Sequence, residues 1–186
     1  MRLLLLGIWA DGLAVGAAFG LALTALWVVA ASSDIVGGRL IEVVRGPGAA
    51  GRLGLAVGGG VAFGLALVAV AMVGASVGGS PVVPGLGRPA APFLPWAAIT
   101  IVVASAEEGI LRGVLFDRLR AAGGLVPAVA ITTIAFALMH VPVYGWHVVP
   151  LDLAVGLGLA GLRLSTGLVV APLAAHVTAD LATWWL

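Results

Sequence analysis

The 186-residue sequence contains no cysteine and very little charge. The absence of cysteine excludes disulfides, thiolate zinc sites and thiol nucleophiles. Nine basic residues stand against eight acidic ones, which leaves a net charge of +1. Proteins that bind DNA or RNA present a basic face to the phosphate backbone. The charge balance therefore argues against a nucleic-acid partner.

Apolar residues dominate the chain. Hydrophobic residues make up 62% of it and charged residues 9%, whereas soluble domains are about 45–50% apolar and about 25% charged. Such a chain cannot cover a water-exposed surface with polar groups, and its apolar runs are long enough for membrane helices. The sequence predicts an all-α, polytopic membrane bundle whose solvent is the lipid bilayer.

Six apolar segments predict about six transmembrane helices. Residues 80–92 contain four prolines and read as a linker. We therefore expect two N-terminal transmembrane helices plus this linker at 1–92, and a separate helical core at 93–186. The six segments are residues 12–31, 53–79, 93–119, 126–141, 148–162 and 167–186.

Arginine placement predicts an orientation. Six arginines fall in or beside the predicted loops on one side of the membrane, whereas only Arg2 and Arg88 fall on the other. Because cytoplasmic loops carry an excess of basic residues, we expect an integral multi-pass protein of a bacterial-type plasma membrane, with both termini outside. The six are Arg39, Arg45, Arg52, Arg118, Arg120 and Arg163.

One glycine motif resembles a nucleotide site by spacing alone. Gly156, Gly158 and Gly161 match the dinucleotide fingerprint, but that fingerprint needs a strand before it and a helix N-terminus at the phosphate. Here the glycines lie inside an apolar helical segment, where small residues allow close helix contact. We expect helix packing and no nucleotide.

Three polar clusters lie deep in apolar segments. Placing an ionisable group inside a membrane costs free energy, so each such group is a candidate functional residue. At 1.5 Å per residue, each cluster lies about 20 Å from the same predicted membrane face. We therefore expect the clusters to meet at one depth. They are Glu107, Glu108 and Arg112 in the third segment, Phe136 and His140 in the fourth, and His176 and Asp180 in the sixth.

Helical spacing separates the two adjacent glutamates. Glu108 and Arg112 are four residues apart and can pair on one face, whereas Glu107 points about 100° away. One glutamate and two histidines form a set that can activate water. His147 and Asp152, near the start of the fifth segment, are interpreted as interfacial and are given no role.

The patterns EExxxR, FxxxH and HxxxD resemble the signature of the CPBP intramembrane proteases. This family takes in the type II CAAX prenyl endopeptidases and the bacteriocin-processing, Abi-type membrane proteins. The resemblance covers about residues 93–186 and implies that this half is a helical catalytic core.

Carried over by residue, the resemblance implies that Glu107 activates water with His140 as its partner. His176 and Asp180 correspond to the pair that faces the oxyanion, although position 180 is commonly asparagine in the family. Glu108 and Arg112 correspond to an ion pair that supports the site, and Phe136 is expected to support it too.

The expected function is therefore that of an intramembrane endopeptidase acting on a peptide or a membrane protein. We favour a hydrolysis without a cofactor. The set of Glu107, His140 and His176 also permits zinc, although no HExxH helix is present. Outside the enzyme class, a membrane scaffold, an immunity-type protein and a proton-conducting protein are the alternatives.

Overall fold

A computed structural model describes residues 20–25, 28, 48–78 and 92–185. All regular structure in these residues is helical, which confirms the predicted all-α class. The predicted first helix lies largely outside the described residues, and so does the linker of residues 80–92.

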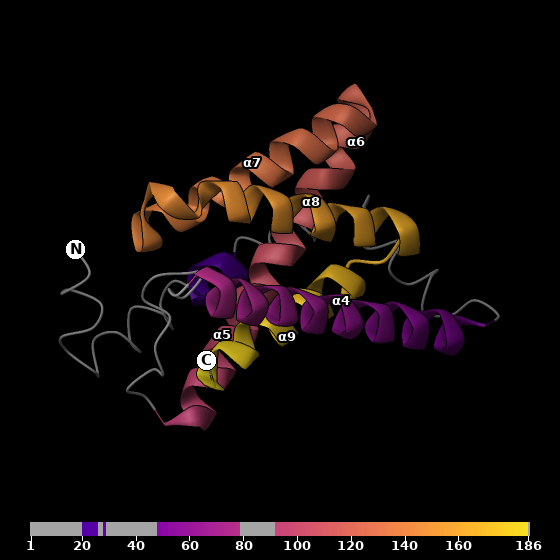
Figure 1. Ribbon diagram of the computed structural model, residues 1–186. Helices are drawn as coiled ribbons and strands as arrows, with labels where there is room; N and C mark the ends of the chain where they lie inside the picture. The colour runs from indigo at the N-terminus through magenta and orange to yellow at the C-terminus, as the bar shows by residue number, and fades with distance from the viewer. Residues whose placement is uncertain (1–19, 26–27, 29–47, 79–91, 186) are drawn as a thin grey trace.

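The helices are labelled as in Figure 1. Three described stretches are long and apolar enough to cross a membrane, namely Ala49–Val73, Leu125–Tyr144 and Trp146–Thr166, in line with an integral membrane protein. The elements are α4 (Ala49–Gly78), α5 (Phe93–Glu108), a π-helical segment (Gly109–Leu115), α6 (Phe116–Gly123), α7 (Leu125–Tyr144), a 3-10 turn (Trp146–Val148), α8 (Val149–Thr166), α9 (Val170–Ala182) and a second 3-10 turn (Thr183–Trp185).

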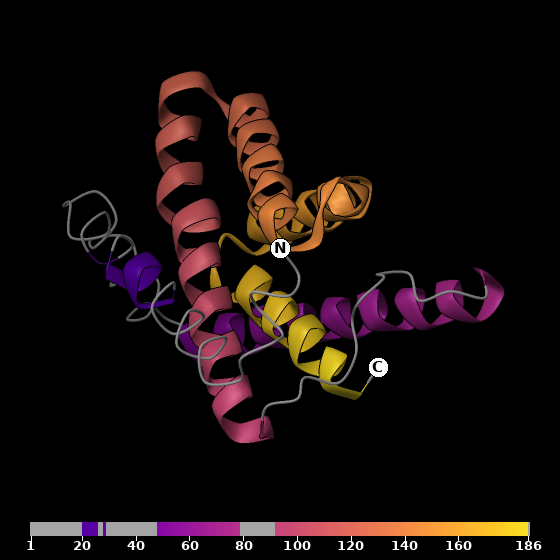
Figure 2. The ribbon, with the colours of Figure 1, turned by 90° about the vertical axis from the view of Figure 1, so that its left-hand side faces the viewer.

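α5, the π-helical segment and α6 form one continuous column. Figure 2 shows this column upright, with α7 returning beside it and α8 seen nearly end-on. The sequence predicted a single helix over 93–119, and the structure extends it to Gly123. Gly124 then turns the chain into α7 with a φ of 87°, a conformation that favours glycine.

The predicted end of the fourth helix at residue 141 was wrong, because α7 continues through Pro142 to Tyr144. Pro142 has no N–H to bond to the carbonyl of residue 138, and its ring crowds that carbonyl, yet α7 continues for two residues beyond it. The end comes at Gly145, which has a φ of 91° and donates its N–H to the Val141 carbonyl over 2.8 Å. Glycine, not proline, ends this helix.

Glycines on α4 allow it to pack closely against α9. A Cβ atom at Gly60 would lie 2.2 Å from the Ala171 carbonyl oxygen, and one at Gly64 would lie 2.5 Å from the Ala175 carbonyl oxygen. From the first contact to the second, the residue number increases by four on both helices. The two helices therefore run in the same direction where they cross. Such contact between small residues is how helices associate closely in lipid.

Two of the three glycines in the α8 motif, Gly156 and Gly158, pack against neighbouring helices as expected, whereas a Cβ atom at Gly161 would meet nothing within 4 Å. A Cβ atom at Gly158 would lie 2.3 Å from the Phe63 ring of α4, and one at Gly156 would lie 3.1 Å from Thr133 of α7. The motif lies inside α8 with no strand before it. α7, α8 and α9 therefore meet α4 and α5 around a core in which Leu111, Phe136, Leu159 and Ala175 are buried.

Candidate active site

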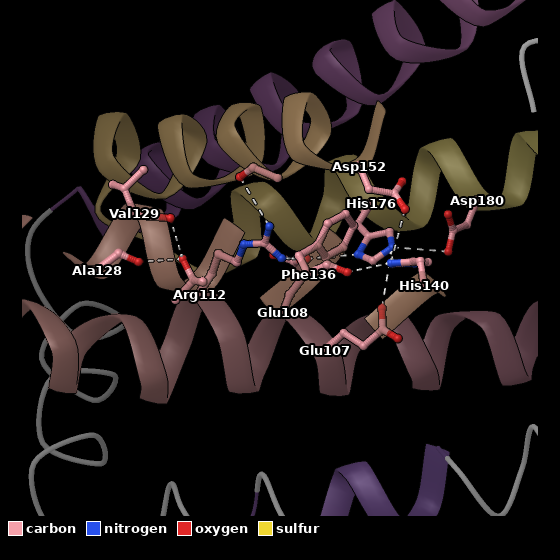
Figure 3. Close-up of polar contacts among 12 residues, drawn as sticks. Glu107, Glu108, Arg112, Ala128, Val129, Phe136, His140, Asp152, His176 and Asp180 are labelled. Carbon is pink, nitrogen blue, oxygen red and sulfur yellow. Dashed lines mark hydrogen bonds and ion pairs between the residues drawn. The ribbon is translucent and has the colours of Figure 1, made fainter. Parts of the chain in front are cut away.

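The three predicted clusters converge where α5, α7 and α9 meet. One ligand atom each from Glu107, His140 and His176 lies within 4.8 Å of the other two. Figure 3 shows these side chains pointing toward one another from three different helices. Glu107 and His176 are buried, and His140 is partly buried. The structure thus brings together residues that are up to 69 positions apart in the chain.

Glu108 and Arg112 form a fully buried ion pair. Arg112 Nη1 donates to Glu108 Oε1 over 2.7 Å, and both side chains are 0% exposed. Arg112 Nη2 also donates to the Gly156 carbonyl of α8 over 3.3 Å. The pair therefore links the α5 column to α8.

Glu108 has a second partner that the sequence did not predict. The same Oε1 atom lies 3.0 Å from Nδ1 of His176. Since that oxygen already accepts a hydrogen bond from Arg112, it accepts from the His176 Nδ1–H as well. This contact turns Nε2 of His176 toward Glu107 Oε2 at 3.8 Å and Asp180 Oδ2 at 3.5 Å. Glu108 therefore orients His176.

His140 is held by its own helix. Its Nδ1 atom lies 2.9 Å from the Phe136 carbonyl oxygen, one turn earlier. Phe136 and Tyr144 lie on either side of it along α7, with ring centroids 4.7 and 5.9 Å from the imidazole. The imidazole therefore has little freedom to turn.

The Phe136 ring contacts all three parts of the site. It meets the His176 ring edge-on at a centroid distance of 5.3 Å, and the Arg112 guanidinium lies 4.5 Å from its centre. A cation over an aromatic face is attracted to the negative potential of the ring. Phe136, which is 3% exposed, thus packs the ion pair and both histidines together.

The π-helical segment changes the backbone hydrogen bonding of the column at Arg112. In an α-helix the Phe116 N–H would bond to the Arg112 carbonyl, but here it bonds to the carbonyls of Leu111 and Gly113. Arg163 of α8 donates its Nε–H to the Arg112 carbonyl over 2.9 Å and pairs with Asp117 over 3.0 Å. π-Helical turns recur at functional sites, where they reorient a side chain.

Asp152, interpreted from the sequence as interfacial and given no role, lies beside the three clusters. Its side chain is 16% exposed, and its Oδ2 atom lies 3.8 Å from Nδ1 of His140. Figure 3 shows Asp152 directed into the cluster from α8. The only sequence signal is that Asp152 precedes Gly156 by four residues and so shares its helix face. His147, by contrast, is exposed.

Comparison with known proteins identifies the family. Residues 89–182 match the family model for "Type II CAAX prenyl endopeptidase Rce1-like", which covers half of the chain and contains all three polar clusters. No curated protein and no solved structure matches the chain. The match bears out the resemblance to the CPBP proteases, so the chain belongs to the Rce1-like type II CAAX prenyl endopeptidase family, a family of membrane proteases.

Proposed function

We propose that this protein is an intramembrane endopeptidase in which Glu107 acts as the general base on water. The observation that carries the proposal is the convergence of Glu107, His140 and His176 within 4.8 Å. Glu107 and Glu108 have different partners: Glu108 pairs with Arg112, whereas Glu107 lies beside His140 and His176. An apolar surrounding disfavours the charged form of a carboxylate, and this suits a base that must take up a proton.

The proposed reaction follows from the contacts. Glu107 takes a proton from a water molecule that His140 orients, and the water oxygen attacks the peptide carbonyl carbon. His176 acts in its imidazolium form, in which Nδ1–H bonds to Glu108 and Nε2–H donates to the oxyanion of the tetrahedral intermediate. Asp180, beside Nε2, faces the oxyanion as a protonated carboxyl group, because an ionised carboxylate has no hydrogen to donate. The C–N bond then breaks, and Glu107 returns its proton to the leaving amine. Water is consumed, and a carboxylate and an amine are formed.

The substrate class proposed is a prenylated C-terminal peptide of the CAAX type, in keeping with the family description. The full-length protein in liposomes should cleave a farnesylated CAAX peptide faster than the same peptide without the lipid. Glu107→Gln, which preserves the shape and removes the proton acceptor, should lower kcat by at least about 100-fold while the melting temperature stays the same. Full activity in this variant would refute the role of Glu107.

Zinc-dependent hydrolysis is the second candidate, because the same three side chains could hold one metal ion. One glutamate and two histidines are the protein ligands of some catalytic zinc sites, where the metal supplies a Lewis acid and activates water. Metal analysis of the purified protein, combined with cleavage assays with and without a chelator, separates the two candidates. Stoichiometric zinc and loss of activity with the chelator would favour this second mechanism.

A further inference from the structure

Asp152 on α8 is a mostly buried carboxylate that the proposed hydrolysis does not use. Its Oδ2 atom lies 3.8 Å from Nδ1 of His140 and has no hydrogen-bond partner among the described residues. A buried acceptor without a donor carries a desolvation cost. Its place beside a site histidine therefore calls for a functional explanation.

The hydrogen bonds of His140 fix which ring nitrogen faces the site. Nδ1 lies 2.9 Å from the Phe136 carbonyl oxygen, and because a carbonyl only accepts, Nδ1 carries the hydrogen. The other nitrogen, Nε2, is therefore the one available to Glu107 and to water. Asp152 lies on the Nδ1 side, opposite the reacting atoms.

We propose that Asp152 is a positioning residue for His140, whose ring it holds with Nδ1–H toward α8 and Nε2 toward Glu107. The inference rests on the proposed role of His140 as the partner of Glu107. Because 3.8 Å is longer than a hydrogen bond, the carboxylate acts by charge, attracting the positive end of the Nδ1–H bond. A carboxylate behind a metal-bound histidine fixes the orientation of the ring, and losing such a partner typically costs about 10–100-fold in metal affinity or activity. We expect an effect of the same order for Asp152 and His140.

Kinetics of the full-length protein test the charge directly. Asp152→Asn keeps the shape of the side chain and removes its charge, so kcat should fall by about 10- to 100-fold with KM nearly unchanged. Asp152→Glu restores the charge and should recover most of kcat. Leu157→Ala, at an exposed position of α8, is the matched control and should keep the wild-type kcat. Full activity in Asp152→Asn, or no advantage of glutamate over asparagine, would overturn the proposal.

A spectroscopic measurement tests the same proposal without turnover. The chain has three histidines, so nitrogen-15 labelling of histidine yields a simple spectrum in which a His140→Gln variant identifies the His140 signals. The wild type should show His140 with hydrogen on Nδ1, and Asp152→Asn, which leaves the Phe136 carbonyl in place, should keep this tautomer but shift the Nδ1 and Nε2 resonances of His140. Unchanged His140 signals would overturn the positioning role. A wild type that cleaves no peptide would refute the proposed function instead, and the spectra would still test Asp152.

Discussion

At the scale of single residues, the site separates two adjacent glutamates by their partners. Glu108 is fully buried and contacts both Arg112 and His176 through one oxygen. Glu107 contacts the histidines from the next position along the helix. The buried ion pair of Glu108 and Arg112 stabilises the packing of the helices, and in the proposed mechanism the neighbouring Glu107 carboxylate acts on water. Substitutions at the two positions should therefore fail in different ways.

Glu108→Gln should destabilise the protein. It leaves the Arg112 guanidinium buried without its anionic partner, and breaking a buried pair in this way costs about 3–5 kcal/mol. It also weakens the acceptor of the His176 Nδ1–H. We expect a lower melting temperature in detergent and an activity that falls together with the folded fraction. A Glu108→Gln protein that is inactive but melts like the wild type, together with a fully active Glu107→Gln, would reverse the roles given to the two glutamates.

Asp180→Asn should preserve activity. The Asp180 side chain is 43% exposed and its Oδ2 atom lies 3.5 Å from Nε2 of His176, so the change buries no new unpaired group. Asparagine offers an N–H donor to an oxyanion and is the residue commonly found here in the family. We expect kcat within about threefold of the wild type and an unchanged melting temperature. A folded but inactive Asp180→Asn would mean that the negative charge itself is required.

At the scale of helices, the sequence predicted what depends on regular spacing. The four-residue separation of Glu108 and Arg112 placed them on one face, and similar distances along three helices placed Glu107, His140 and Asp180 at one depth. Arrangements that depend on packing between helices were not predictable. In the π-helical segment the Arg112 carbonyl accepts a hydrogen bond from Arg163 of α8, and no local pattern signals that contact.

Asp152 and Pro142 show the same limit. Asp152 looks interfacial because it lies near a helix start, and only the packing of α8 against α7 brings it to His140. Pro142 looks like a helix end, yet α7 continues for two residues beyond it. In each case the general tendency of the residue was overridden by its position in the fold.

The α4–α9 crossing makes a prediction at this scale. Gly60→Ala would place a Cβ atom 2.2 Å from the Ala171 carbonyl oxygen, which is backbone and cannot move away alone. Separating the helices should cost about 1–3 kcal/mol, as in other overpacked interiors. Gly58→Ala is the matched control, because a Cβ atom there meets nothing within 4 Å and alanine favours the helix. Melting curves should show a loss for Gly60→Ala alone. Equal curves would contradict the close crossing.

At the scale of the whole molecule, Arg118, Arg120 and Arg163 lie toward the α6 end of the column, and the site lies near the middle of the column. Asp117 in α6 pairs with Arg163 near the end of α8, so these two segments lie at the same end of the molecule. Glu107 lies midway between residues 92 and 122 of the column, about 22 Å from each at 1.5 Å per residue. Where such a column spans a bilayer, a site at its middle lies within the hydrocarbon core of the bilayer, which is about 30 Å thick.

We propose that the end of the column formed by α6 faces the cytoplasm, because Arg118, Arg120 and Arg163 lie on that side. The chain has no native cysteine, so single cysteines at Pro92 and Ala122, both exposed, can be labelled without a background. An impermeant thiol reagent on intact cells should label Pro92→Cys, and it should label Ala122→Cys only after the membrane is permeabilised. A reagent that labels Ala122→Cys alone would invert the orientation. Labelling of both on intact cells would show that residues 92–122 do not span the membrane, and would remove the basis for placing Glu107 inside it.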